Sequence, residues 1–383
     1  MMLLVWRLPA GAQPAPLGAP LIATTSATLD RILLYDLTGG QRELQFDTQL
    51  HTAFAFSPDG CRVVFTLTEP GGVSRIYSAR LDGSDVRPLV QFADLPAADW
   101  SAWEPAVNPT DGRIAFTLFR RERPPGAEPE ETFHIAWIPL EGGAPQFYSV
   151  SGAEHTPVWS PDGAWLAYVA YDGRVPGPDI FSTVPPTDPA AGTPVPDEDL
   201  LNEADLWVVS ADGSNKYRLT AFPIGNVSMP RWSPDSTLLS FVFSPTFAND
   251  TFWMIGNADE AEPTQRSFET ALAVEMTWLP DGTAFLATVR DFQQTSENRL
   301  WRIPLVGNAD TDATPYPLDP VLRFIDYPRF SPDGRYLALR SEYTLVVIDT
   351  QTGGWGYVDE GQGANTQPVW SPAGFAGETT CAD

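Results

Sequence analysis

The chain has 383 residues, and 49 acidic against 23 basic residues give it a formal net charge of −26. Such a field repels phosphate backbones and anionic lipid surfaces, which argues against binding to nucleic acids and to membrane surfaces. No apolar run reaches the length of a membrane-spanning helix, so we expect no membrane span. The simplest interpretation of the charge is solubility, and the alternative is attraction of cations or basic partners.

The N-terminal region divides into two parts. Residues 1–19 join a short apolar start to a Pro- and Ala-rich stretch, and we interpret them as a tail or the remnant of an export signal. Three strand-like runs follow at 20–26, 31–40 and 42–46.

A short signature then recurs seven times along the chain. An apolar or aromatic residue is followed by Ser or Asn, then Pro, usually Asp, and Gly; the first copy is FSPDG at 56–60. The copies are anchored on Phe56, Val107, Trp159, Trp232, Trp278, Phe330 and Trp370, at steps of 51, 52, 73, 46, 52 and 40 residues. Repeats of this length, built from short strands and turns, predict an all-β fold, a β-propeller of seven four-stranded antiparallel blades.

The residue types of the signature predict a structural role. Pro presets φ for a tight turn, Asp accepts hydrogen bonds from nearby backbone amides, and Gly adopts positive φ without strain. The preceding aromatic residue is expected to fill the interface between adjacent blades. We therefore expect Asp59, Asp162 and Asp333 to be turn residues and not catalytic groups.

The last signature, at Trp370, has almost no chain after it, whereas three strands precede the first signature. We expect the N-terminal strands to complete the seventh blade and close the ring, which leaves no open sheet edge. This closure brings Cys61 close to Cys381, and we predict a disulfide bond between them in an oxidising compartment. The domain would span 20–374, with a C-terminal tail at 375–383.

The longest insertion, 172–205, explains the 73-residue step. It is Pro-rich and acidic, with too few apolar residues for a core of its own. It is either a lid or partner-docking loop of blade three, or a tolerated surface insertion.

The repeated [WF]-S-P-D-G followed by a hairpin resembles the TolB-like propeller repeat, which also occurs in oligogalacturonate lyases and in the propeller parts of some peptidases. The resemblance covers roughly 20–374. This sequence departs from the repeat pattern at Leu279 in place of Ser, Ser236 in place of Gly, Ala373 in place of Asp, and the extra Thr110. We expect these departures to have little effect on the fold. Polysaccharide lyases of this repeat class use a histidine-rich metal site in the channel, so the resemblance implies a lyase as one alternative.

The residues at the start of the strand that leads into each signature, which are followed by Pro in five of the seven repeats, are expected to surround the mouth of the central channel. A ligand site there would combine carboxylates, aromatic rings and histidine. We predict that its residues are Trp103, Glu104, His155, Glu275, Asp326, Tyr327 and Gln367. Trp100, Trp103 and Tyr327 could stack on sugar rings, or could instead pack between blades.

The function that we predict is a non-catalytic, extracytoplasmic binding scaffold: a periplasmic, secreted or envelope-anchored monomer that binds a protein or a small ligand such as a saccharide. The sequence requires no cofactor and has no nucleophile elbow, Walker motif or dinucleotide motif. The alternative is a polysaccharide or oligogalacturonate lyase-like enzyme. It would hold a divalent cation at His51, His155, Glu104, Glu275 or Asp326.

Overall fold

The structure is a computed structural model that describes residues 15–90, 95, 99–122, 130–149, 152–176, 200–222, 225–245, 250–266, 271–291, 298–318, 322, 324–358 and 367–381. This part of the chain is almost entirely β. Its helical structure is confined to short elements such as α1 (Ala309–Asp312) and the 3-10 turn Glu378–Thr380. No helix in the described part is both long and apolar enough to cross a membrane.

The strands pair in antiparallel groups of four, and most groups follow chain order. The first three groups after the N-terminal strands are β4 (Leu50–Phe56), β5 (Arg62–Thr68), β6 (Ser74–Arg80) and β7 (Arg87–Pro88); β8 (Ser101–Val107), β9 (Ile114–Glu122), β10 (Glu130–Ile138) and β11 (Gln146–Phe147); and β12 (Glu154–Trp159), β13 (Trp165–Pro176), β14 (Leu200–Ser210) and β15 (Lys216–Arg218). The next three are β16 (Asn226–Trp232), β17 (Leu238–Ser244), β18 (Thr251–Gly256) and β19 (Thr264–Gln265); β20 (Ala271–Trp278), β21 (Ala284–Asp291), β22 (Asn298–Pro304) and β23 (Thr314–Pro315); and β24 (Ile325–Phe330), β25 (Tyr336–Ser341), β26 (Thr344–Asp349) and β27 (Trp355–Tyr357).

One further sheet joins the two ends of the chain. Its strand order is β28 (Val369–Trp370), β1 (Leu21–Thr25), β2 (Arg31–Asp36) and β3 (Gln41–Gln45). Ile22 pairs with Trp370 and Ala23 with Val369, so the last strand completes the sheet begun by the first three. The groups β12–β15 and β16–β19 count as one sheet because a single parallel bridge, Ala204 to Asn226, connects them.

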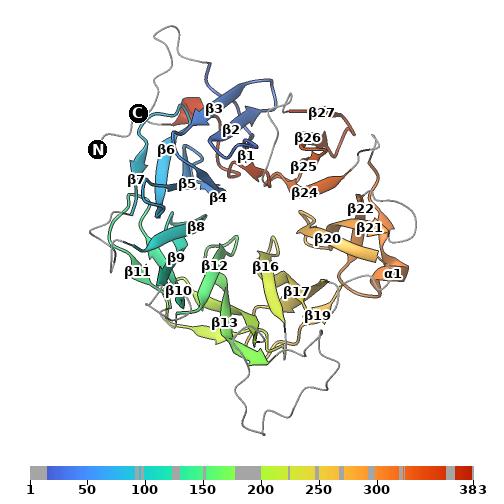
Figure 1. Ribbon diagram of the computed structural model, residues 1–383. Helices are drawn as coiled ribbons and strands as arrows, with labels where there is room; N and C mark the ends of the chain where they lie inside the picture. The colour runs from blue at the N-terminus through green and yellow to red at the C-terminus, as the bar shows by residue number, and fades with distance from the viewer. Residues whose placement is uncertain are drawn as a thin grey trace.

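The sheets lie side by side around a common centre (Figure 1). The strands nearest that centre are β4, β8, β12, β16, β20 and β24, each the first of its group in the chain. We call these strands, together with β28, the inner strands.

The signature forms the turn that leaves each inner strand. Asp59 Oδ1 accepts hydrogen bonds from the Ser57 hydroxyl (2.5 Å) and the Cys61 amide (3.0 Å). Asp162 does the same with Ser160 (2.5 Å) and the Ala164 amide (3.0 Å). These carboxylates are therefore occupied within their own turns, as a structural role requires.

The signature tryptophans attach each inner strand to the preceding one. The indole N–H groups of Trp159, Trp232, Trp278 and Trp370 donate to the backbone carbonyls of Ala106, Val158, Arg231 and Arg329, at 3.1, 3.0, 3.2 and 3.1 Å. All four side chains are buried. Each tryptophan thus contributes apolar contact area and one directional bond across the interface between neighbouring groups.

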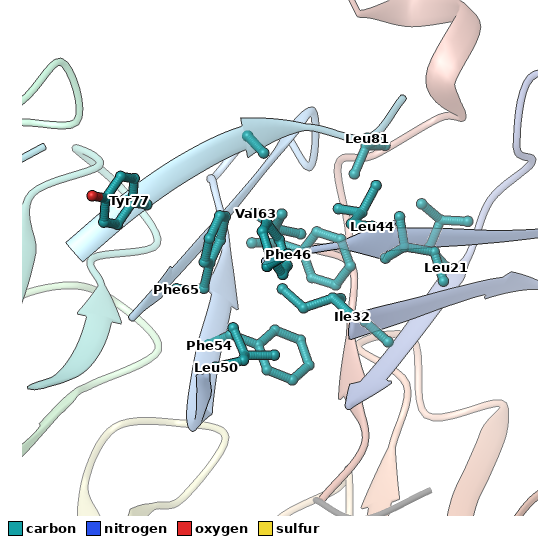
Figure 2. Close-up of a cluster of buried hydrophobic side chains, with 14 of the residues drawn as sticks. Leu21, Ile32, Leu44, Phe46, Leu50, Phe54, Val63, Phe65, Tyr77 and Leu81 are labelled. Carbon is teal, nitrogen blue, oxygen red and sulfur yellow. The ribbon is translucent and has the colours of Figure 1, made fainter. Parts of the chain in front are cut away.

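The apolar core lies between neighbouring sheets. Figure 2 shows the cluster between β1–β3 and β4–β6, in which Leu21, Ile32 and Leu44 face Val63 and Phe65. The strands are buried on both faces. In β5, for example, five consecutive residues are buried, and successive residues of a strand point to opposite faces of the sheet. A four-stranded sheet with two apolar faces is stable only with a neighbour on each side.

The segment expected to be a C-terminal tail packs against the first sheets. Phe375 is buried, and Glu378 accepts hydrogen bonds from the Arg42 guanidinium and from the Leu17 amide (2.8 Å). Cys381 forms a disulfide bond with Cys61, with 5.5 Å between the two Cα atoms and 320 positions between them in the sequence. The two ends of the chain are therefore fastened to the same region.

We expect Gly60→Ala to be much more destabilising than Gly353→Ala. Both glycines have positive φ, +74° and +72°, so the backbone strain of an alanine is matched. A Cβ at 60 would lie 2.6 Å from Phe375 Cδ2, whereas a Cβ at 353 meets no atom within 4 Å. Overpacking should cost Gly60→Ala about 1–3 kcal/mol more in unfolding free energy, measurable by urea denaturation. Equal losses would show that Phe375 does not pack on this turn.

Candidate functional site

The inner strands share a distortion at the positions where the sequence predicts a site. Four of them have a register shift that includes a residue with positive φ directly before a proline. These residues are Glu104, Thr156, Met229 and Tyr327, with φ between 51° and 56°. Left-handed backbone in a non-glycine residue costs about 1–3 kcal/mol and persists only where the surroundings enforce it. Part of that enforcement comes from carboxylates of neighbouring sheets.

Glu104 connects two neighbouring groups. Its Oε2 accepts hydrogen bonds from the Thr117 hydroxyl (2.8 Å) on β9 and from the strained Thr156 amide (3.0 Å) on β12. The predicted site residue Glu104 is therefore present at the inner strands, and its carboxylate is already engaged by protein donors.

Next to Glu104 lies a run of rings that we call the aromatic cluster: Trp103, Phe119, Phe133, His155 and Tyr171. Ring centroids are 4.3 Å apart for Trp103 and Phe119, 4.9 Å for Phe119 and Phe133, and 4.9 Å for His155 and Tyr171. All five side chains are half-buried. The cluster therefore presents a partly accessible aromatic surface built from β8, β9, β10, β12 and β13.

Burial lowers the pKa of His155, and the nearby Glu104 only partly offsets this. Its Nδ1 lies 2.9 Å from the Thr156 hydroxyl. Its Nε2 and the Trp103 indole nitrogen are buried without a hydrogen-bond partner in the described part of the chain. Unsatisfied polar atoms of this kind are uncommon in folded proteins.

A second group of side chains, which we call the arginine cluster, consists of Arg231, Glu275, Arg329 and Gln367. Glu275 Oε1 accepts from Arg231 Nη2 (3.1 Å) and Arg329 Nη2 (2.5 Å), and Gln367 Oε1 accepts from the same two nitrogens. Glu275 Oε2 accepts from the strained Tyr327 amide (2.9 Å). Residues from β16, β20, β24 and the segment before β28 thus meet at one place.

The arginine cluster carries an excess of positive charge. Two guanidinium groups share one carboxylate, and burial together with the charge of Arg329 lowers the pKa of Arg231 to about 9. The Glu275 side chain is only 7% exposed, against 25% for Arg231 and 13% for Arg329. The carboxylate lies deepest, and Arg231 is the more exposed of the two arginines.

The remaining predicted residues lie beside the arginine cluster. Asp326 accepts from Arg340 Nη2 (2.8 Å), and Arg340 lies over the Tyr327 ring at 4.7 Å from its centroid. Tyr343, 73% exposed, is the second ring near Arg340, at 5.7 Å.

The predicted residues therefore separate into two groups. Trp103, Glu104 and His155 lie together, while Glu275, Tyr327 and Gln367 lie with Arg231 and Arg329, which the sequence analysis missed. The proline–arginine pairs in PRWSPD (230–235) and PRFSPD (328–333) could have revealed both arginines. Trp100 is buried and stacks on His134, so the sugar-stacking interpretation was wrong for that residue. Residues 177–199, most of the 172–205 insertion, lie outside the described residues.

No three His, Cys, Asp or Glu side chains in the described ranges approach closely enough to form a metal site. Three carboxylates were predicted as possible ligands. Glu104 is bound by hydroxyl and amide donors, Glu275 by guanidinium and amide donors, and Asp326 by Arg340.

The fold has clear counterparts among solved structures. The puromycin-hydrolysing peptidase of Mycobacterium tuberculosis superposes with a TM-score of 0.60 at 16% identity, covering 92% of this chain but only 56% of the peptidase. Oligogalacturonate lyase in complex with manganese superposes with a TM-score of 0.52 at 15% identity, covering 81% of this chain and 79% of the lyase. This chain therefore shares a propeller-like architecture with the peptidase and the lyase. At sequence identities this low, the similarity shows the fold alone.

TolB from Acinetobacter baumannii superposes with a TM-score of 0.48 at 16% identity, covering 92% of this chain and 83% of TolB. No family model matches the sequence, and no curated protein matches it.

Proposed function

We propose that the chain is a seven-bladed propeller of the TolB-like type, closed by β28 and β1, and that it is a non-catalytic binding scaffold outside the cytoplasm. The seven signatures, the groups of four strands and the pairing of Ile22 with Trp370 support this architecture. The disulfide bond supports an oxidising location, because such bonds persist mainly in exported proteins.

The ligand would bind where the inner strands distort, at the mouth of the central channel. The single observation on which this rests is the meeting of side chains from several sheets at strained backbone positions, which concentrate at functional sites. The aromatic cluster offers faces for stacking, and the arginine cluster offers charged donors.

A binding role fits the chemistry better than the lyase alternative. A general acid or base must reach the substrate, and a metal ligand must present free oxygen atoms. Both Glu275 oxygens accept from Arg231, Arg329 or the Tyr327 amide, and Glu104 Oε2 accepts from Thr117 and Thr156. These two carboxylates are engaged in holding neighbouring inner strands together.

The test is a binding screen on an array of neutral and acidic oligosaccharides and short peptides, with wild type, Trp103→Ala, Arg231→Gln and the control Trp355→Ala. Trp355 is a 43% exposed aromatic residue on the outer strand β27. We expect at least one ligand whose binding weakens tenfold or more in Trp103→Ala or Arg231→Gln and is unchanged in the control. Binding insensitive to both site variants would contradict a site at the inner strands. Turnover of a bound saccharide, or stoichiometric metal in purified protein, would favour the lyase.

A further inference from the structure

The arginine cluster contains two cations for one anion in a chain whose net charge is −26. Both guanidinium groups bond to Glu275 Oε1, so their like charges lie close together and repel. The partial burial of both arginines strengthens this repulsion. Asp326, beside the cluster, already pairs with Arg340. One positive charge of the cluster is therefore left without a counter-ion among the described residues.

Arg231 also has unused donors. A guanidinium has five N–H groups. Arg231 Nη2 bonds to Glu275 and Gln367, whereas its Nε and Nη1 have no partner in the part of the chain that the structure describes. Neither of these two nitrogens is buried, so solvent reaches both of them.

Other arginines show how the fold usually satisfies this group. Arg335 donates from both Nε (3.2 Å) and Nη2 (2.9 Å) to Asp349, and Arg113 contacts Asp111, Tyr148 and a backbone carbonyl. Arg231 differs because its own carboxylate partner is shared with Arg329. The exposed Met229 beside it adds an apolar surface, 53% exposed, to the same small hollow.

We propose that the arginine cluster recognises a carboxylate group of the ligand, bound through the open Nε and Nη1 donors of Arg231. This rests on the proposed function, since it assigns a chemical class to the ligand of the same site. Guanidinium–carboxylate hydrogen bonds are short and strong, and they discriminate acids from amides or alcohols of the same shape. The carboxylate belongs either to a sugar acid or to a peptide C-terminus, and the two sources share this chemistry.

The experiment is isothermal titration calorimetry with matched probes. One pair is D-glucuronate and D-glucose; the other is acetyl-trialanine and its C-terminal amide. We expect one acid to bind at least tenfold more tightly than its neutral match, which identifies the source. Arg231→Gln should remove this difference, and Arg335→Gln, an equal charge change at a guanidinium that is already paired with Asp349, should retain it. Glu275→Gln should strengthen binding of the acid, because it removes the competing carboxylate.

Equal binding of acid and neutral probes, weakened in Trp103→Ala, would overturn the carboxylate assignment and leave the proposed site intact. No binding of either acid would also overturn it. Should Arg231→Gln fail to fold, wild-type protein provides the readout through phenylglyoxal modification of arginines, mapped by mass spectrometry. The bound acid should protect Arg231 at least tenfold, whereas Arg335 should react at an unchanged rate; no protection overturns the proposal.

Discussion

Replacing Cys61 and Cys381 together with serine should lower the free energy of unfolding by about 5 kcal/mol. The bond joins residues 320 positions apart, so in the chain-entropy model it removes a very large loop-closure entropy from the unfolded state. The double substitution leaves no unpaired thiol to form mixed disulfides. Urea denaturation followed by tryptophan fluorescence measures the loss.

Two comparisons separate the covalent bond from the packing around it. Wild type in a reducing buffer should behave like the double serine variant. Glu378→Gln, which keeps the bond but weakens the contact with Arg42, should cost only about 1–2 kcal/mol. Unchanged midpoints for both the reduced protein and the serine variant would mean that the bond does not constrain the unfolded chain.

The second large effect is expected for Glu275→Ala, which should destabilise the fold by about 3 kcal/mol. The substitution leaves Arg231 and Arg329 facing each other without the carboxylate between them, and it removes the acceptor of the strained Tyr327 amide. We place the loss at the lower end of the range for buried pairs because both arginines are partly exposed.

Glu43→Ala is the matched control, since Glu43 pairs with Arg31 at 3.0 Å on the surface and is 43% exposed. Its loss should stay below about 1 kcal/mol. Thermal and urea unfolding of the two variants measure the difference. A cost for Glu275→Ala as small as for Glu43→Ala would show that the arginine cluster contributes little to the connection between the inner strands.

The strand order and the joining of the chain ends could be predicted from the sequence because the signature is chemically demanding. Its Pro, Asp and Gly define a turn in each repeat, so the position of every inner strand follows by counting. The pairing of Trp370 with Ile22 and the closeness of Cys61 to Cys381 follow from that register. These features depend on local turn chemistry, which is readable in a single sequence.

The site was predicted less completely, for a geometric reason. The register shift before each inner-strand proline breaks the two-residue alternation of a β-strand, so alternation cannot tell which neighbours face inward. The predicted site comprised residues before the proline, whereas Arg231 and Arg329 lie one residue after it. Most equivalent positions hold Ala or Val, as at Ala106, Val158 and Val369.

The sheet made from both ends of the chain has a consequence for biosynthesis. β1, β2 and β3 emerge from the ribosome well before their fourth strand, β28, because the other six groups of strands lie between them in the sequence. At about 5–20 residues per second, the N-terminal strands wait tens of seconds for their partner. During that time the edge of β1 that later pairs with β28 is open to other strands. Protection of this edge by a chaperone, or synthesis coupled to export in an unfolded state, would keep the nascent chain from aggregating.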